Sequence, residues 1–308
     1  MSLKTKLLQY PAVLDLVFWR DYYRGMFNYA FRPVETIRRR FVRKCHYEPD
    51  LNEPKTYNEK LQWLKFHWYD PLAEQCADKI EVRKYVAQKG FEHCLIPMLG
   101  TFSSAKELDL SALPGRFALK AAHCSGMVLL CTDSSRFDRA AAEKECRRWL
   151  KINYFHYSAE WVYKKLKHRI IAEQMLETPD GKPPVDYKIY CFHGEPKCVM
   201  VASGRMEKQL CMDFFTPEWE RLPFTRHNPN SKIPPEKPEM LDEMLEMART
   251  LSEPFPHARV DLYCIQKKIW FGEITFFPAT GMQPFDPFEY DLLFGSWLDL
   301  SKVEKKHG

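Results

Sequence analysis

The 308-residue sequence contains no long apolar run and none of the short motifs that mark several common enzyme classes. No stretch of about 18 apolar residues occurs, so we expect no transmembrane helix. A GxxxxGK[ST] phosphate loop, a strand-borne GxGxxG fingerprint, a GxSxG elbow and an HExxH zinc motif are all missing. Their absence argues against P-loop and Rossmann nucleotide binding, against an α/β-hydrolase and against a zinc protease.

The ten cysteines show no CxxC pair and no spacing typical of a zinc site. In a chain of this size we therefore expect reduced, mostly buried thiols, as in a cytoplasmic protein. The N-terminus has no apolar stretch followed by a small-residue cleavage site, so the sequence predicts no signal peptide. These features favour a cytoplasmic location, and a position at the inner face of the membrane stays open.

The positive charge of the chain lies in its first fifty residues, which hold ten Lys/Arg and five Asp/Glu, whereas the rest holds 36 of each. Aromatic residues are interleaved between Phe18 and Phe31. Such a segment suits contact with an anionic membrane or an acidic polysaccharide. The alternative is a helix packed on the main domain with a solvated basic edge. Nucleic-acid binding is disfavoured, because the remaining sequence is neutral and carries no nucleic-acid motif.

The first hundred residues favour helices, and strand-like sequence begins at about residue 115. Thr56, followed three residues later by Glu59, forms a capping-box pattern that predicts a helix start. Residues 77–86 carry a core stripe that predicts a second helix, which Gly90 ends. Helices followed by strands and hairpins indicate an α+β protein.

Two stretches near the C-terminus, residues 258–265 and 269–277, alternate in the manner of strands. Residues 266–268 between them are predicted to form a hairpin turn. With the turn centred on its middle residue, Asp261 lies opposite Glu273. Paired residues of two strands point to the same face of the sheet, so the two carboxylates would meet there.

Facing carboxylates repel each other unless something compensates their charge. A divalent cation would compensate, and Mg²⁺ prefers oxygen ligands of this kind. The same register places Arg259 opposite Thr275, on the face that carries Asp261 and Glu273. A structural salt bridge between Arg259 and Glu273 is therefore the alternative to a metal site.

Four further groups carry charge or flexibility at strand ends. Lys120 has alanines two residues away on either side, and Ser125-Gly126 follows as a turn whose amides could cover phosphates. Asp186 and Lys188 share one strand face, as a ribose and phosphate contact or as a surface salt bridge. Glu173 ends an apolar strand before a Pro/Gly loop, as part of a hinge or as a cap for the next element. An exposed lysine beside a hairpin turn is the alternative for Lys120.

Several blocks of sequence, in this order, resemble the ATP-grasp enzymes and in particular their teichuronopeptide-biosynthesis (TupA-like) branch, which is associated with bacterial surface polysaccharides. Residues 1–45 lie outside the strong match. The matching blocks are Pro54–Leu64, Ala77–Lys79, Phe117–Lys120, His123–Gly126, Asp186–Lys188, Cys191–Gly194, Arg259–Tyr263 and Phe271–Gly281.

The resemblance implies an ATP-grasp fold in which two antiparallel-sheet lobes hold ATP, with a helical N-terminal region. We expect four parts, which are a basic aromatic helical segment, a helical pre-grasp region, a small lobe, and a large lobe with the metal site. Their ranges are residues 1–50, 51–113, 114–176 and 177–308.

The resemblance also implies a role for each residue of an ATP site. Lys79 and Lys120 would bind phosphates, and Ser125-Gly126 would belong to the loop that covers them. The stretch from Glu173 through Gln174 to Leu176 would be the adenine hinge. Asp186 would contact the ribose.

The metal site and the reacting group follow from the same resemblance. Asp261 and Glu273 would bind Mg²⁺, Arg259 would stabilise an acyl phosphate, and Lys188 would lie near the transferred phosphoryl group. Many ATP-grasp enzymes carry Asn two residues after the metal-binding Glu, and Thr275 stands at that position here. Its hydroxyl or backbone can still reach a metal, but a second metal site is in doubt.

These roles predict an ATP-dependent carboxylate–amine ligase that forms an amide through an acyl phosphate. The family suggests a glycan uronic acid or an amino acid as one substrate, and thus a role in modifying a bacterial surface polysaccharide or its precursor. An alternative is a kinase of the same fold that phosphorylates a sugar hydroxyl. A non-catalytic adaptor of polysaccharide assembly is another, against which the retained lysines and carboxylates argue.

Overall fold

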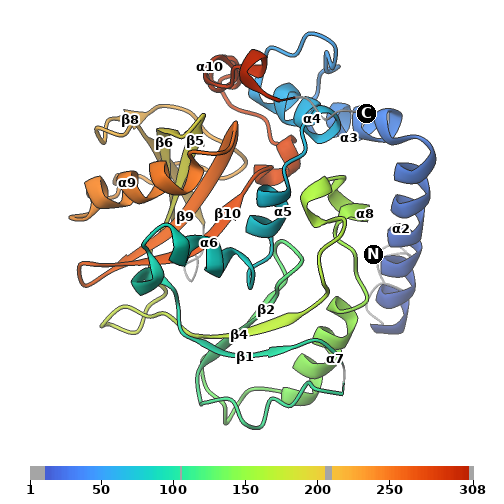
Figure 1. Ribbon diagram of the computed structural model, residues 1–308, viewed down its shortest axis with the longest axis vertical. Coiled ribbons are helices and arrows are strands. Elements are labelled where there is room, and N and C mark those ends of the chain that lie inside the picture. The colour runs from blue at the N-terminus through green and yellow to red at the C-terminus, as the bar shows by residue number, and fades with distance from the viewer. Residues whose placement is uncertain (1–10, 105, 205–209, 305–308) are drawn as a thin grey trace.

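Two antiparallel sheets form the centre of the computed structural model, which describes residues 11–104, 106–204 and 210–304, with side chains from residue 16 onward. The four-stranded sheet has the order β1-β4-β2-β3, and the six-stranded sheet has the order β10-β9-β5-β6-β7-β8. Figure 1 shows the first sheet in the lower part of the view and the second at the upper left. The expected α+β fold with two antiparallel-sheet lobes is confirmed, whereas the four-part division of the chain stays a prediction.

The strands follow each other in the chain as two groups, one for each sheet. The four-stranded sheet contains β1 (Met98–Phe102), β2 (Phe117–Ala121), β3 (Val128–Cys131) and β4 (Ile170–Gln174). The six-stranded sheet contains β5 (Asp186–Phe192), β6 (Glu195–Ser203), β7 (Cys211–Phe215), β8 (Arg221–Leu222), β9 (His257–Ile265) and β10 (Lys268–Thr275).

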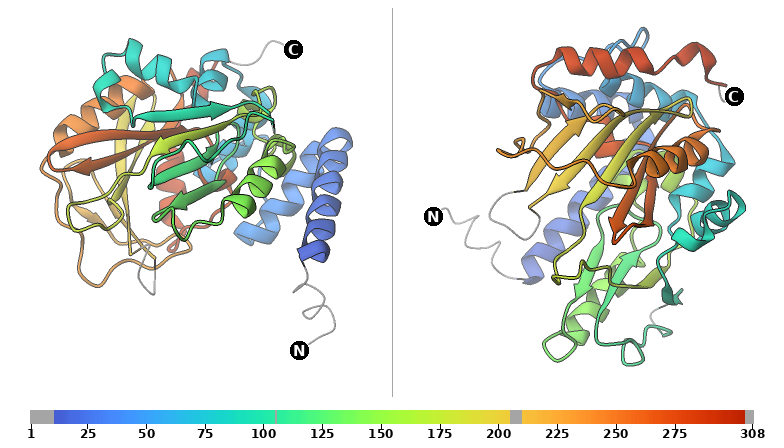
Figure 2. Two further views of the ribbon diagram at one scale, coloured as in Figure 1. Left: turned by 90° about the horizontal axis from the view of Figure 1, so that it is seen from below. Right: turned by 90° about the vertical axis from the view of Figure 1, so that its left-hand side faces the viewer.

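Helices surround both sheets, and α2 and α3 lie together at one edge of the molecule (Figure 2). The α-helices are α2 (Pro11–Phe31), α3 (Pro33–Cys45), α4 (Tyr57–His67), α5 (Pro71–Ala77), α6 (Val82–Gln88), α7 (Arg139–Trp149), α8 (Phe155–Ser158), α9 (Leu241–Ser252) and α10 (Glu289–Trp297). The short 3₁₀ turns are η1 (Glu92–Cys94), η2 (Trp161–Tyr163), η3 (Pro278–Gly281) and η4 (Leu300–Lys302).

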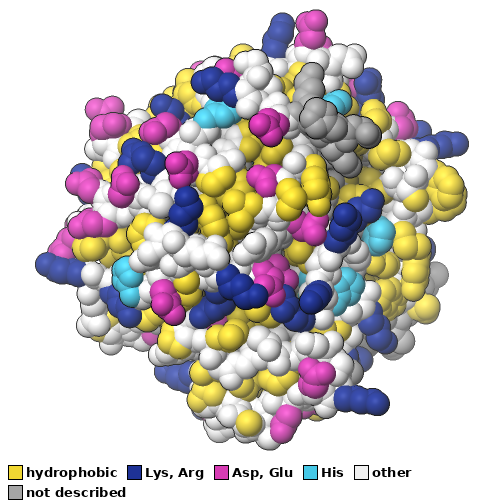
Figure 3. Space-filling view, viewed as in Figure 1, with side chains coloured by type: hydrophobic (Ala, Val, Ile, Leu, Met, Phe, Trp, Pro, Cys, Tyr) yellow, Lys and Arg dark blue, Asp and Glu magenta, His cyan; other side chains and the backbone are white. Residues whose placement is uncertain are grey.

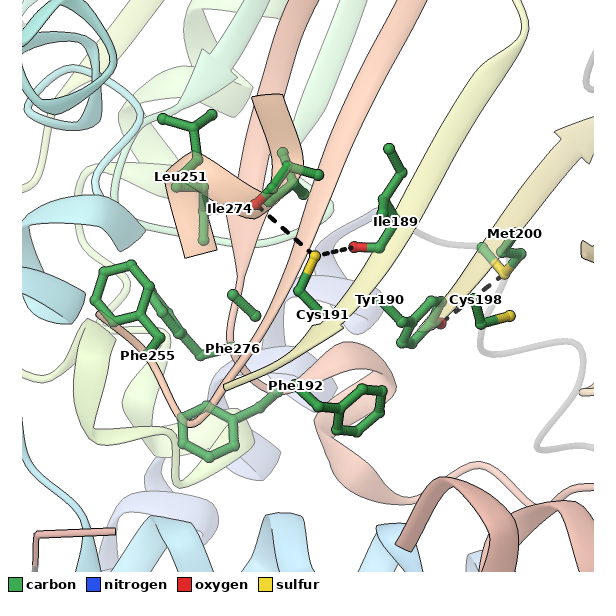
Figure 4. Close-up of a cluster of buried hydrophobic side chains, with 14 of the residues drawn as sticks. Ile189, Tyr190, Cys191, Phe192, Cys198, Met200, Leu251, Phe255, Ile274 and Phe276 are labelled. Atoms are coloured by element: carbon green, nitrogen blue, oxygen red, sulfur yellow. Dashed lines mark hydrogen bonds between the residues drawn. The ribbon is translucent and has the colours of Figure 1, made fainter. Parts of the chain in front are cut away.

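One face of the six-stranded sheet is apolar and packs against α9. The Cys191 sulfur points to this helix, 3.8 Å from the carbonyl oxygen of Ala248 (Figure 4). Tyr190 leaves the opposite face, where it packs beside the side chains of α4 and α10. Because strand side chains alternate, Asp186 and Lys188 share the face of Tyr190. Asp186 and Lys188 therefore lie on the side of the sheet away from α9.

The predicted start of α4 is confirmed. The predicted helix over residues 77–86 is confirmed from Val82 onward and is wrong for residues 78–81. Thr56 accepts a hydrogen bond from the Glu59 backbone, and the Glu59 carboxylate accepts one back from the Thr56 backbone. The second helix is divided, because Asp78 is extended and its carboxylate accepts hydrogen bonds from the next two free backbone N–H groups, those of Ile80 and Glu81. This local cap competes with helix continuation, so Lys79 lies on a turn between α5 and α6.

The turn between β9 and β10 differs from the predicted one. Ile265 pairs directly with Lys268, so the turn consists of two residues and not three. Gln266 and Lys267 both have positive φ, at 49° and 59°. This is the backbone of a type I′ turn, whose twist matches that of the flanking strands.

A β-bulge at Gly272 restores the predicted carboxylate pair. Counted from the two-residue turn, Asp261 would lie opposite Gly272. The register shifts between Phe271 and Glu273, and Asp261 pairs with Glu273. The prediction of facing carboxylates is thus confirmed, although it rested on a longer turn and a regular ladder.

The basic N-terminal segment forms helices α2 and α3, and one side of each packs on the rest of the protein. The interpretation as a packed helix is confirmed for that side. Ile37, Phe41 and Cys45 of α3 are buried against Met282. Tyr22 of α2 belongs to the core of the four-stranded sheet. No helix in the described part of the chain is long and apolar enough to cross a membrane.

Candidate active site

Three charged residues lie side by side across three neighbouring strands of the six-stranded sheet. Lys188 of β5 pairs with Asp261 of β9, and Asp261 pairs with Glu273 of β10. In the next row Arg259 lies beside Thr275. These residues share the face away from α9, so the sheet itself holds their side chains together.

Arg259 is the cation between the two carboxylates. Its Nε and Nη2 donate to the two oxygens of Asp261 at 2.6 and 2.7 Å, a bidentate pair. The same Nη2 lies 3.5 Å from Glu273 Oε1 and donates to Thr275 Oγ1 at 3.2 Å. The Thr275 hydroxyl in turn donates to Glu273 at 3.1 Å. The salt bridge that the sequence offered as an alternative is therefore present, and it serves both carboxylates.

Lys188 connects this row to Asp186. Its amine contacts Asp261 and lies 2.8 Å from Asp186 Oδ2. The side chains of Lys188 and Asp186 are 12% and 3% exposed, so the pair is not the surface salt bridge considered from the sequence. Burial would lower the pKa of Lys188, but the charges of Asp261, Asp186 and Glu273 together raise it, so this buried lysine keeps its proton.

Lys79 reaches the row from the turn between α5 and α6. Its amine donates to the carbonyl oxygen of Cys124 at 2.7 Å and lies 3.6 Å from Glu273 Oε2. Its backbone N–H donates to Ala122 O at 3.1 Å. Cys124 belongs to the turn between β2 and β3, so one lysine joins the four-stranded sheet to Glu273 of the six-stranded sheet.

The turn that carries Lys79 is fixed by Arg169, which precedes β4. The Arg169 guanidinium donates to Asp78 at 2.8 Å and to Glu81 at 3.0 Å. The Asp78 side chain is almost fully buried. A buried and charge-paired turn holds the lysine backbone in one place, which a helix end exposed to water would not do.

A second charged group lies on the four-stranded sheet. Lys120 of β2 donates to Glu173 Oε2 of β4 at 2.7 Å, and Arg83 of α6 lies 3.3 Å from Glu173 Oε1. Glu173 therefore binds two cations and does not cap a following element. Arg83 was missed by the sequence interpretation, which had no motif for it.

The remaining predicted residues lie near this second group. Gln174 is the last residue of β4 and is exposed, and its backbone N–H donates to Pro97 O at 2.9 Å. Leu176 follows in the loop and is half-buried. Ser125 and Gly126 lie in the β2–β3 turn next to Cys124, and Gly126 has a φ of 75°, which suits glycine. Lys79 contacts both Cys124 and Glu273, so the β2–β3 turn lies beside the charged row of the six-stranded sheet. Figure 3 shows acidic and basic side chains gathered near the middle of the face that it views.

The charges around Glu273 hold it ionised. Burial alone would raise the pKa of Glu273, but Lys79, Arg259 and Lys188 together lower it to about 2. For Asp261, burial pushes the pKa upward, against the opposite effect of Arg259 and Lys188. The charge of Asp261 therefore depends on these two cations.

The donor set fits one Mg²⁺ ion better than a larger metal centre. Two facing carboxylates, completed by phosphate oxygens and water, are a usual environment for Mg²⁺. No group of three or more His, Cys, Asp or Glu side chains suited to a metal occurs among the residues that the structure describes. The Thr275 hydroxyl donates a hydrogen bond to Glu273, so in this arrangement its side chain positions the Glu273 carboxylate.

Comparison with solved structures finds several ligases whose sequences have low identity to this chain. The D-alanine–D-alanine ligase of Helicobacter pylori is 13% identical, with 80% of this chain and 67% of that chain covered and a TM-score of 0.44. The Bacillus anthracis D-alanine–D-alanine ligase complexed with ATP is 13% identical, with 71% and 62% covered and a TM-score of 0.41. The L-amino acid ligase of Bacillus licheniformis is 14% identical, with 68% and 42% covered and a TM-score of 0.39.

This chain spans 62% of the length of the Bacillus anthracis enzyme and 42% of that of the Bacillus licheniformis enzyme. No curated protein sequence matches the chain. The model of one protein family, TupA-like ATP-grasp, matches residues 59–299. That range contains both sheets and every charged residue described above. The chain therefore belongs to the TupA-like ATP-grasp family.

Proposed function

We propose that this protein is an ATP-dependent carboxylate–amine ligase that attaches an amino acid or amine to a bacterial surface polysaccharide or its precursor. The observation that carries the proposal is the row formed by Lys188, Asp261 and Glu273, with Arg259 across it. Family membership supplies the expectation of ATP, and the row supplies charges suited to phosphoryl transfer. Because ATP is a cytoplasmic substrate, we place the reaction in the cytoplasm.

In the proposed reaction a substrate carboxylate oxygen forms a bond to the γ-phosphorus of ATP while the bond to ADP breaks. The acyl phosphate is then attacked by an amine, which loses a proton and releases inorganic phosphate as the amide forms. Phosphoryl transfer depends mainly on positioning and on stabilising charge. A site built from lysines, an arginine and carboxylates meets those needs.

The nucleotide contacts come from both sheets in this proposal. Lys79 and Lys120 would bind phosphate oxygens, because each amine lies near a carboxylate that a phosphate can replace as its partner. Ser125-Gly126 would cover the phosphates with backbone N–H groups. Residues 173–176 would lie along the adenine, and Asp186 would accept a ribose hydroxyl.

Asp261 and Glu273 would hold Mg²⁺, which neutralises negative charge on phosphate oxygens when bound. Arg259 would stabilise the acyl phosphate, since its fork-shaped guanidinium suits planar and tetrahedral oxyanions. Lys188 would lie beside the transferred group and compensate its charge. The low pKa of Glu273 keeps this ligand ionised at neutral pH.

The test is an ATP-turnover screen with uronic-acid glycans as carboxylate donors and amino acids as amines. ADP, free phosphate and product mass are followed together. A ligase releases ADP and phosphate only when both substrates are present, and its product gains the mass of an amide. A phosphorylated sugar without free phosphate would identify a kinase instead, and failure to bind ATP by calorimetry would contradict both.

A further inference from the structure

Helix α2 is fixed to the protein by one side. Gly25 lies so close to α8 that a β-carbon there would be 2.7 Å from the His156 carbonyl oxygen. On the same side the Tyr22 hydroxyl accepts a hydrogen bond from the Asn153 backbone at 3.0 Å, and Tyr29 is buried. Close packing therefore sets the orientation of α2, and with it which side chains of the helix point away from the protein.

The free face of α2 is apolar. Leu16, Tyr23, Phe27 and Phe31 are 71%, 55%, 62% and 70% exposed. They are spaced seven, four and four residues apart, so they form one stripe along the helix, which we call the outer stripe. The rings of Phe27 and Phe31 contact each other at 4.6 Å between centroids. A packed helix with a solvated basic edge does not explain four large apolar side chains in water.

A basic groove of about 610 Å³ lies beside the outer stripe, between α2, α3 and α8. Its lining has two acidic residues, and each pairs with an arginine, Asp21 with Arg20 at 2.7 Å and Glu35 with Arg39 at 2.6 Å. Six arginines line the groove, which we call the arginine groove: Arg20, Arg24, Arg32, Arg39, Arg40 and Arg43.

The arginine groove carries an excess of positive charge. Arg40 donates to the Tyr29 hydroxyl and to the Tyr157 carbonyl, so it also holds α3 to the rest of the protein. Within the described ranges, no carboxylate forms an ion pair with Arg24, Arg32 or Arg43, and all three are exposed. The groove therefore presents arginines that an anion can bind.

We propose that the α2–α3 hairpin binds the surface of an anionic lipid membrane, with the outer stripe at the headgroup boundary and the arginine groove at lipid phosphates. An apolar helix face flanked by arginines is the pattern of a helix that lies in a membrane surface. An acidic glycan would use the arginines but leaves the stripe in water. A second copy pairing through this face would bring two arginine grooves together, and their like charges repel.

This attachment is separate from the proposed ligase reaction, because none of its residues belongs to the charged row. Binding of the full chain to phosphatidylcholine vesicles, with and without phosphatidylglycerol, tests it by flotation. The wild-type protein is expected to bind the vesicles that contain phosphatidylglycerol and not those of phosphatidylcholine alone. Added salt should weaken this binding. The variant R24Q/R32Q/R43Q should lose about fivefold in affinity per arginine at low salt. F27S/F31S should lose at least about a hundredfold, since both rings leave the interface.

Matched controls alter exposed residues elsewhere. R136Q/K182Q/K302Q removes three cations whose side chains are 89%, 77% and 66% exposed, and I233S removes an apolar side chain that is 84% exposed. Both should bind vesicles like wild type. All variants are compared by thermal melting, so that loss of folding is seen separately.

Three results would overturn the proposal. Wild-type vesicle binding by F27S/F31S would show that the stripe does not meet lipid. Loss of self-association in that variant, by light scattering, with unchanged vesicle binding would identify an interface between copies. Binding to polygalacturonate that needs the arginines, without any vesicle binding by wild type, would identify an acidic glycan as the ligand.

Discussion

Gly272 lies against the backbone of Asp261 so closely that a β-carbon at residue 272 would be 2.9 Å from the Asp261 carbonyl oxygen. The Tyr263 ring would be 3.2 Å from the same β-carbon. This glycine is the extra residue of the bulge that brings Glu273 opposite Asp261. A side chain at residue 272 would therefore push against the strand that carries Asp261.

Gly272→Ala should destabilise the protein by about 1–3 kcal/mol, because backbone must move to admit the methyl group. ATP turnover should fall by more than the loss of folded protein, since Glu273 shifts relative to Asp261. Urea unfolding and turnover per folded molecule measure the two effects. Gly100→Ala is the control, because a β-carbon there meets only the Phe102 ring, at 3.7 Å. Unchanged turnover in Gly272→Ala would show that the bulge does not position the pair.

Glu273→Gln should reduce Mg²⁺-dependent ATP turnover at least about 100-fold while the fold is retained. The amide keeps the shape but removes the charge that faces Lys79 and Arg259. Asp261→Asn should also abolish turnover, but it should cost stability too, because Arg259 and Lys188 lose their buried partner. Turnover and thermal melting are measured for both, with Glu253→Gln as a control on an exposed carboxylate. Near-normal turnover in Glu273→Gln would remove this residue from the metal site.

Lys120→Met should weaken ATP binding about tenfold or more, whereas Arg116→Met should change it little. Lys120 is partly buried beside Glu173, whereas Arg116 has a half-exposed side chain that pairs with Glu177. Both substitutions remove one positive charge from the same part of the chain. The change in net charge is therefore the same in both variants, and a difference in ATP affinity reports on the position of the side chain. Calorimetry with ATP gives the two affinities. Equal values would place Lys120 outside the nucleotide site.

The buried His257 should make the protein less stable in acid. Burial lowers the pKa of His257 from 6.5 to about 3, and its ring lies 3.0 Å from the Tyr57 hydroxyl and 2.9 Å from Phe276 O. As the pH falls below 6.5, the unfolded chain takes up a proton at this residue and the folded chain does not. Stability present above pH 6.5 is therefore lost progressively toward pH 3.

Urea unfolding across this pH range measures the effect. His257→Gln should show a shallower loss of unfolding free energy with falling pH than wild type, whatever its stability at neutral pH. His93→Gln, at an exposed histidine, should keep the wild-type slope. A wild-type slope in His257→Gln would mean that other groups cause the acid sensitivity.

The strands of the β9–β10 hairpin and the facing pair of carboxylates were predictable from the sequence, because alternation and a short turn are local properties. It did not predict the two-residue turn or the bulge. Both depend on the backbone geometry at Gln266, Lys267 and Gly272. The turn is one residue shorter than predicted and the bulge adds one residue to β10, so the two effects on the register cancel. The correct pair thus followed from two errors of opposite sign.

Residues that meet only through the tertiary fold were harder to predict. Arg83 contacts Glu173 from a helix that the sequence interpretation began too early, because Asp78 caps a new turn. The exposed side of α2 was also not predictable, since the aromatic residues between Phe18 and Phe31 occupy both its packed and its free face. The packing partner of a helix decides which of its apolar residues remain in water.

The position of Lys79 limits how the two sheets can move. Its amine holds a carbonyl oxygen of the β2–β3 turn and a carboxylate of β10 with one four-carbon side chain. The sheets can separate only until one of these contacts breaks, and the ion pair to Glu273 is the longer of the two. A shift of the β2–β3 turn away from β10 would therefore draw the lysine away from Glu273, so the position of the four-stranded sheet is coupled to the charge that surrounds this carboxylate.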